Sequence, residues 1–211
     1  MKKKSLSSLN FVGILRCMIS RIYLRLRFPF SNIKKWHFRA NYYCRPYKKN
    51  IVDIVNTIKP DIVVEIGCGI GDICSRVESS KVYGIDIDKE AINIAKKLNQ
   101  LPNYINEDPL KNKTNFELFL NSLPESEIKV FIAVNWLHSI SYPLVKEFME
   151  RLLKVPNIYL IVDKYTRGYK FKSINKKLNH DFEMIFQEER FILIKNIDEV
   201  RDFIILENIK I

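Results

Sequence analysis

Acidic residues are absent from the first 50 positions of this 211-residue chain, although that segment contains 13 Lys and Arg residues. The rest of the chain has 22 basic and 24 acidic residues, so the net charge of +11 belongs to the N-terminal segment. A globular domain that bound a polyanion over a broad face would have a basic excess of its own. The near-neutral remainder therefore argues against nucleic acid as a partner of the region after residue 50.

Cysteine is scarce and forms no recognisable pattern. The four cysteines, Cys17, Cys44, Cys68 and Cys74, include no CxxC pair, so their spacing suits neither a zinc site nor a disulfide scaffold. Asp163 ends an apolar run but has no companion carboxylates in sequence. We therefore expect reduced thiols, a cytoplasmic protein and no bound metal.

Long uncharged runs are also missing. Arg16 and Arg21 interrupt the apolar N-terminal stretch, which is too short for a transmembrane helix and lacks the cleavage site of a signal peptide. Residues 10–29 instead have the pattern of an amphipathic helix. Three roles stay open for this helix: packing on its own domain or on a partner chain, lying in an anionic membrane interface at the inner face of the membrane, or binding RNA or another polyanion. We assign residues 1–50 to a basic extension and 51–211 to the globular domain.

From residue 51 onward, β-rich runs alternate with helical periods. This order is typical of an α/β fold with a mostly parallel sheet, whose ligands bind outside the carboxyl ends of the strands. The expected strands are 61–66, 81–86, 104–105, 128–134 and 157–163, with an antiparallel edge ribbon from 191–194 and 201–206. The expected helices are 51–58, 71–79, 88–99, 114–122 and 143–154.

A glycine turn follows the first expected strand. Gly67, Gly69 and Gly71 alternate with Cys68 and Ile70, and this spacing lets the backbone approach a ligand closely. The turn lacks the final glycine of a dinucleotide fingerprint and the Gly-Lys-Ser/Thr of a P-loop. The second strand ends at Asp86, which offers a carboxylate to a ribose diol.

These runs together resemble the class I S-adenosylmethionine (SAM)-dependent methyltransferases over residues 60–163. Val63 to Gly71 is similar to the family's first motif, and Val82 to Ala95 is similar to its second. Asn106 to Leu110 resembles the third motif, and Val134 to His138 resembles the segment after the fourth strand. The resemblance implies a Rossmann-like fold with a seven-stranded, mostly parallel sheet, an antiparallel edge and helices on both faces.

The resemblance also implies that the cofactor is SAM. Asp86 would bind the ribose hydroxyls, Asp108 would lie near the adenine amine and Asn135 beside the sulfonium. Gly67 and Gly69 would line the methionine moiety, and Glu65 would orient the loop or the cofactor's amino group. The expected cofactor-binding set is Glu65, Gly67, Cys68, Gly69, Asp86, Ile87, Asp108 and Asn135.

The segment after the fourth strand bears on the acceptor. Family members that methylate nucleic-acid amino groups have Asn/Asp-Pro-Pro-aromatic there, whereas this chain has Asn135-Trp136-Leu137-His138. Transfer to a hydroxyl requires a base, and a neutral histidine serves at neutral pH. We expect His138 as the catalytic base, with His180 as the second candidate after a lid near residues 164–178.

Aromatic and basic residues are concentrated at 36–47, and Tyr43, Arg45 and Trp136 are the expected substrate-binding residues. With the segments around His138 and His180, this stretch is similar to small methyltransferases of bacterial surface-polysaccharide biosynthesis. That similarity implies O-methylation of a sugar or lipid-linked saccharide. Two alternatives stay open: an rRNA or tRNA methyltransferase that uses the basic N-terminus, and a non-catalytic, cofactor-binding regulatory subunit.

Overall fold

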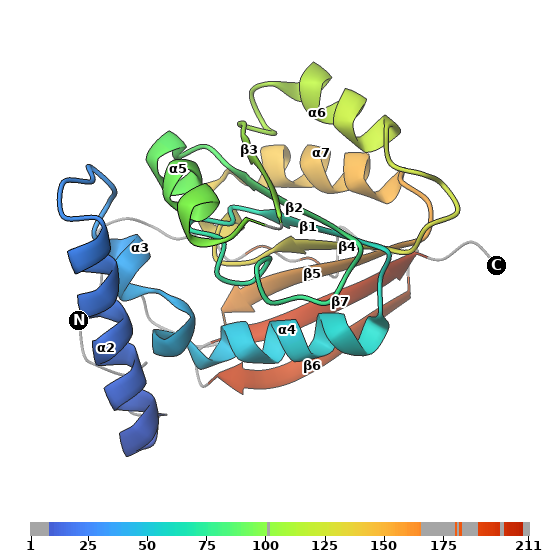
Figure 1. Ribbon diagram of the computed structural model, residues 1–211. Helices are drawn as coiled ribbons and strands as arrows, with labels where there is room; N and C mark the ends of the chain where they lie inside the picture. The colour runs from blue at the N-terminus through green and yellow to red at the C-terminus, as the bar shows by residue number, and fades with distance from the viewer. Residues whose placement is uncertain are drawn as a thin grey trace.

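The computed structural model contains one seven-stranded sheet with the strand order β3-β2-β1-β4-β5-β7-β6 (Figure 1). The structure describes residues 9–100, 102–165, 180, 182, 190–198 and 201–208. The strands are β1 (Ile62–Ile66), β2 (Lys81–Asp86), β3 (Asn103–Asn106), β4 (Lys129–Ala133), β5 (Ile158–Tyr165), β6 (Arg190–Asp198) and β7 (Arg201–Asn208).

The first five strands are mutually parallel, and β7 pairs antiparallel with both β5 and β6. The expected α/β class, seven-stranded sheet and antiparallel edge are therefore confirmed. β1 lies between β2 and β4. The chain adds β2 and β3 on one side of β1 and then returns to add β4 and β5 on the other side. Ligands in such sheets bind at this switch point, outside the carboxyl ends of the strands.

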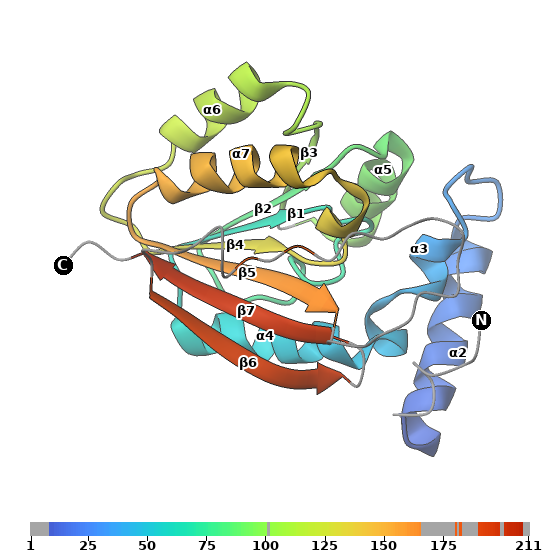
Figure 2. The ribbon, with the colours of Figure 1, turned by 180° about the vertical axis from the view of Figure 1, so that it is seen from behind.

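Helices cover both faces of the sheet, as expected. α6 (Lys113–Asn121) and α7 (Tyr142–Leu153) lie on one face, and α4 (Pro46–Ile58) lies on the other (Figures 1 and 2). α5 (Lys89–Leu98) shares a buried cluster with α4, to which Ile51 and Ile92 both contribute. Each layer therefore buries its own side of the sheet.

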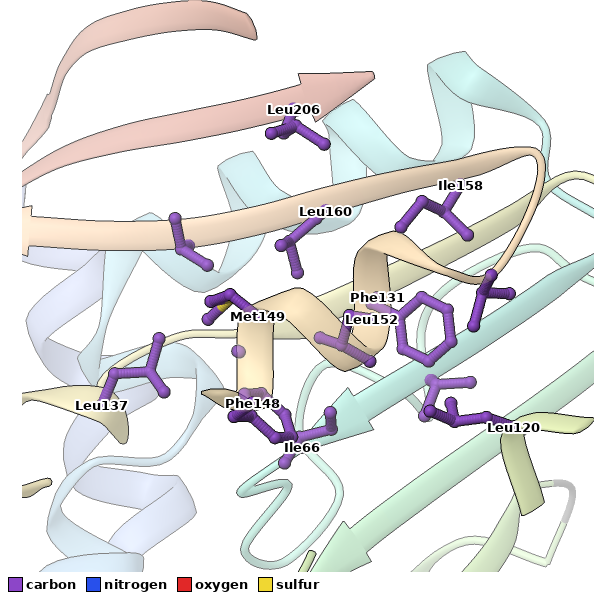
Figure 3. Close-up of a cluster of buried hydrophobic side chains, with 14 of the residues drawn as sticks. Ile66, Leu120, Phe131, Leu137, Phe148, Met149, Leu152, Ile158, Leu160 and Leu206 are labelled. Carbon is purple, nitrogen blue, oxygen red and sulfur yellow. The ribbon is translucent and has the colours of Figure 1, made fainter. Parts of the chain in front are cut away.

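The larger buried cluster lies between α6, α7 and the sheet. Phe148 and Met149 of α7 gather with Phe131 of β4 and Leu160 of β5, and all four side chains are fully buried (Figure 3). Burial of each such side chain stabilises the fold by about 1.5 to 3 kcal/mol. This packing holds the strand ends that form the site in a rigid frame.

The structure contradicts the expected helix at 71–79: residues 71–76 form successive turns, and 77–79 have no regular structure. The Ser75 N–H donates to the Gly71 carbonyl, but the Arg76 N–H donates to Ile73, three residues back. The Cys74 N–H donates to the Glu65 carboxylate at 2.9 Å. A side chain from β1 thus takes a backbone donor that a regular helix would use internally.

The N-terminal extension forms α2 (Phe11–Arg27), α3 (Trp36–Arg39) and the 3₁₀ turn η1 (Tyr42–Cys44). Cys17 of α2 and Cys44 of η1 form a disulfide, so the expectation of four reduced thiols is wrong for this pair. The two residues are 27 positions apart, and only the fold brings them together. Cys68 and Cys74 are free and buried.

Candidate functional site

A cleft of about 270 Å³ opens at the carboxyl ends of β1, β2 and β4. The extension contributes one wall through Trp36 and His37 of α3, and Lys48 contributes from the first turn of α4. The sequence-predicted residues that line the cleft are Glu65, Gly67, Cys68, Gly69, Asp86, Ile87, Asn135 and Trp136.

The glycine turn forms the floor of the cleft in a conformation that requires glycine. Gly67 and Gly69 have φ values of +76° and +56°. A Cβ at Gly67 would lie 3.1 Å from the Cβ of Trp136, and one at Gly69 would lie 2.9 Å from Nδ1 of His37. Glycine therefore lets Trp136 and His37 pack directly on the turn.

Asp86 connects this turn to the end of β2. Its Oδ2 accepts a hydrogen bond from the Gly69 N–H at 2.7 Å, and its Oδ1 accepts one from the Asp88 N–H at 2.8 Å. Each carboxylate oxygen keeps a further acceptor position. The side chain also lines the cleft, so these positions fit a pair of hydroxyl donors such as a ribose diol.

Charged groups gather at the β1 side of the cleft. Glu65 is 6% exposed, and burial raises its pKa to about 7, although the nearby Lys48 ammonium opposes the shift. Lys48 lies 2.8 Å from Asp72. Burial is the largest single influence and lowers the pKa of Lys48, but Asp72, Tyr47 and Glu65 together outweigh it and the pKa is raised. Lys48 and Asp72 were not identified from the sequence, because no motif marks them.

His37 is a further cleft residue that the motifs did not reveal. Its ring stacks on Trp36 with centroids 3.9 Å apart, and Nε2 lies 3.4 Å from the Asp88 carboxylate. Burial lowers the pKa of His37, while Asp86 and Asp88 act in the opposite direction. The only available signal was its position within the aromatic and basic stretch 36–47.

Asp108 is not among the residues that line the cleft. Its Oδ1 accepts hydrogen bonds from the Leu110 N–H at 3.1 Å and the Lys111 N–H at 3.3 Å, which closes a turn after β3. Glu107 and Pro109 on either side line the cleft instead. The adenine role of Asp108 stays a prediction, and this structure does not bring its carboxylate to the cleft.

The two predicted catalytic histidines are buried behind the cleft wall. His138 Nε2 lies 3.2 Å from Oδ2 of Asp163, and both side chains are almost completely buried. Oδ1 of Asp163 accepts a hydrogen bond from the Asn135 N–H at 2.7 Å. His180 Nε2 lies 3.0 Å from the Leu137 carbonyl oxygen, and burial lowers the pKa of His180. Neither histidine is among the lining residues, but Asp163 couples His138 to the cleft residue Asn135.

The predicted substrate residues are dispersed. Trp136 lines the cleft, whereas Tyr43 lines a second cavity of about 210 Å³ beside α2, and Arg45 precedes α4. Of the lid expected at 164–178, residues 164 and 165 belong to β5, and 166–178 lie outside the described residues. Among the residues that the structure describes, no group of three or more His, Cys, Asp or Glu side chains could hold a metal ion.

Comparison with known proteins places this geometry in context. A family model described as a methyltransferase domain matches residues 59–199. The ribosomal RNA small subunit methyltransferase A of Alkaliphilus oremlandii (strain OhILAs) is 31% identical over 120 residues. That alignment covers 54% of this chain but only 41% of the relative.

Two solved structures illustrate the shared fold. The N-methyltransferase NodS from Bradyrhizobium japonicum WM9, in complex with S-adenosylhomocysteine (SAH), has a TM-score of 0.63 at 14% identity and covers 90% of this chain and 100% of its own. Human N-acetylserotonin methyltransferase in complex with SAM has a TM-score of 0.62 at 15% identity, covering 83% of this chain and 55% of its own. At these identities the likeness extends to the fold alone.

Proposed function

The chain belongs to the methyltransferase-domain family and is a SAM-dependent methyltransferase. We propose that its acceptor is a hydroxyl of a sugar or lipid-linked saccharide. The observation that carries the choice of a hydroxyl is the buried pair of His138 and Asp163, 3.2 Å apart, at the ends of β4 and β5. A hydroxyl loses its proton as it attacks, so it needs a base that an already nucleophilic acceptor, such as an unprotonated amine, can do without.

The cleft residues fit SAM, which supplies a methyl group activated by a positively charged sulfur. Asp86 would hold the ribose hydroxyls through its remaining acceptor positions. Lys48 would pair with the carboxylate of the methionine moiety, and Glu65 or Asp72 would accept from its ammonium group. Gly67 and Gly69 would let the backbone approach the ligand closely.

The proposed base acts through its close contact with the buried Asp163 carboxylate. The Asp163 carboxylate orients the His138 imidazole and stabilises the imidazolium that forms when it takes a proton. Because Asp163 also accepts from the Asn135 N–H at 2.7 Å, the imidazole is coupled to the cleft wall. Proton transfer to His138 then requires a bridging water or a small movement of Asn135 or Ser139, which line the cleft.

Aromatic cleft residues support a saccharide acceptor. Trp136 lines the cleft, and Trp36 lines it while remaining 48% exposed. Flat aromatic faces beside polar groups suit a ligand that has both C–H faces and hydroxyls. A sugar satisfies both requirements.

Loss of the ribose contacts provides the direct test of the cofactor site. We expect Asp86→Ala to weaken SAH binding by about 2 to 4 kcal/mol, roughly 30- to 1000-fold, measured by calorimetry. The matched control is Asp53→Ala, because Asp53 pairs with Lys49 on the exposed face of α4 and should leave affinity unchanged. Unchanged affinity in a folded Asp86→Ala protein would remove Asp86 from the site.

A second candidate function is rRNA or tRNA methylation, favoured by the 31% identity to an rRNA methyltransferase. Incubation with methyl-labelled SAM and either purified lipid-linked saccharides or deproteinised rRNA separates the two. Label in the saccharide supports our proposal. Label in rRNA, with binding that falls steeply as salt increases, supports the alternative. SAH binding without transfer to either acceptor would indicate a regulatory subunit.

A further inference from the structure

Helix α2 directs its apolar side away from the protein. Phe11 and Leu26 are 81% and 75% exposed, and the intervening apolar residues on the same side are about half exposed. We call this surface the α2 apolar face; it consists of Phe11, Val12, Leu15, Met18, Ile19, Ile22, Tyr23 and Leu26. Such a contiguous exposed apolar surface marks an interaction site rather than ordinary surface composition.

The opposite side of α2 is firmly attached to the rest of the protein. Cys17 and Leu24 are buried, and Cys17 forms the disulfide to Cys44. The Ser20 hydroxyl hydrogen-bonds Oδ1 of Asn41 at 3.1 Å, and the Arg21 guanidinium donates to the Arg39 carbonyl at 2.9 Å. These contacts fix the orientation of the helix, so the outward α2 apolar face is a defined feature of the fold.

Arginines border the α2 apolar face. Arg16 and Arg27 lie along one side of it in the helical projection, Arg25 lies along the other, and all three are exposed. No acidic residue occurs anywhere in the first 50 positions to offset them. An apolar stripe flanked by arginines, with a tyrosine at its edge, matches an interface in which acyl chains lie beneath anionic headgroups.

We propose that α2 docks this protein on the surface of an anionic lipid bilayer, with the helix lying in the plane of the interface. Among the described residues no helix is long and apolar enough to cross a membrane. The 17-residue α2 has four arginines along its length, and a helix with this distribution lies at the interface instead of spanning it.

Docking through α2 brings the cleft close to the lipid surface. The connection from α2 to α3 contains Phe30, which is 95% exposed, and α3 contributes Trp36 to both the surface and the cleft. In both views α2 and α3 lie together at the side of the sheet where β5 ends (Figures 1 and 2). Docking would therefore bring the side of the molecule that contains the cleft toward the bilayer, which favours an acceptor held in the membrane; this consequence rests on the proposed function, whereas docking itself does not.

Vesicle co-sedimentation of the full chain tests the inference without requiring an acceptor. We expect the wild type to bind phosphatidylcholine–phosphatidylglycerol vesicles at low salt, and to bind pure phosphatidylcholine vesicles or mixed vesicles at high salt much more weakly. The double variant Ile19→Glu/Ile22→Glu should lower the partition coefficient by about 30-fold or more. Both side chains are more than half exposed, so the substitutions should leave the fold intact.

Leu118→Glu is the matched control, because Leu118 is 64% exposed on α6, outside the α2 apolar face. It should bind vesicles as the wild type does, and all variants should retain their SAH affinity. Absence of wild-type binding, or binding that the double variant does not weaken, would overturn the proposal. A wild-type dimer in light scattering that the double variant converts to a monomer, without vesicle binding, would assign the face to a second copy of this chain.

Discussion

Glu65 shows how one buried side chain couples stability to pH. Burial raises its pKa from 4.5 to about 7, so between these pH values the folded protein holds a proton that the unfolded chain releases. The free energy of unfolding should therefore fall as pH rises through this interval, by about 3 kcal/mol between pH 4.5 and 8. The loss is complete only about one pH unit above the pKa of the folded state, near pH 8.

Urea unfolding of the wild type and Glu65→Gln across pH 4.5 to 8, without ligand, measures this effect. Gln cannot ionise, so the difference in unfolding free energy should grow in favour of the variant by about 3 kcal/mol as pH rises. Taking the difference cancels the opposite contributions of His37 and His180, whose pKa values burial lowers. A pH-independent difference would contradict the raised pKa.

His138 and Asp163 allow chemistry to be separated from cofactor binding. If His138 accepts the acceptor's proton, His138→Ala should lower turnover by about 100- to 10,000-fold while SAH affinity changes little. Asp163→Asn should lower turnover as well, because the imidazole loses its orienting carboxylate. His180→Ala provides the comparison. If His138→Ala kept normal turnover and only His180→Ala lost it, His180 would be the catalytic base instead.

At the scale of elements, the disulfide determines how firmly α2 is attached. The disulfide between Cys17 and Cys44 closes a loop of 27 residues and so restricts the conformations open to a detached α2. In the chain-entropy account this stabilises the attached helix by about 3.5 kcal/mol. Cys17→Ser should therefore raise amide hydrogen exchange in α2 by roughly 400-fold while amides of β1 and β4 exchange as before. Wild-type protein under reducing conditions should match the variant, and equal α2 exchange in oxidised and reduced wild type would contradict this prediction.

The turns at 71–76 show how a tertiary contact overrides local sequence preference. The periodicity there favours a helix, but the Glu65 carboxylate accepts from the Cys74 N–H and ties the segment to β1. The same contact positions Asp72 to pair with Lys48 of α4 at 2.8 Å. In place of a regular helix, this segment forms turns that bring Asp72 and Lys48 to the cleft.

At the scale of the whole molecule, the excess positive charge and the exposed apolar surface of α2 occur in the same N-terminal segment. The basic excess lies in the first 50 residues, and the same segment contains the exposed apolar face of α2. The near-neutral remainder forms the sheet and its covering helices. The segment that would contact a polyanionic surface is therefore distinct from the domain that forms most of the cleft, although α3 and α4 connect the two.

The sequence by itself determined the sheet, its parallel order and the glycine turn with Asp86, because alternating apolar periods and a turn that requires positive φ are local properties. It also identified α2 as amphipathic. Only the tertiary structure decided that the apolar side of α2 faces outward, that Cys17 meets Cys44, that Lys48 and His37 enter the cleft and that Asp163 pairs with His138. Each depends on contacts between residues distant in sequence, which no local pattern encodes.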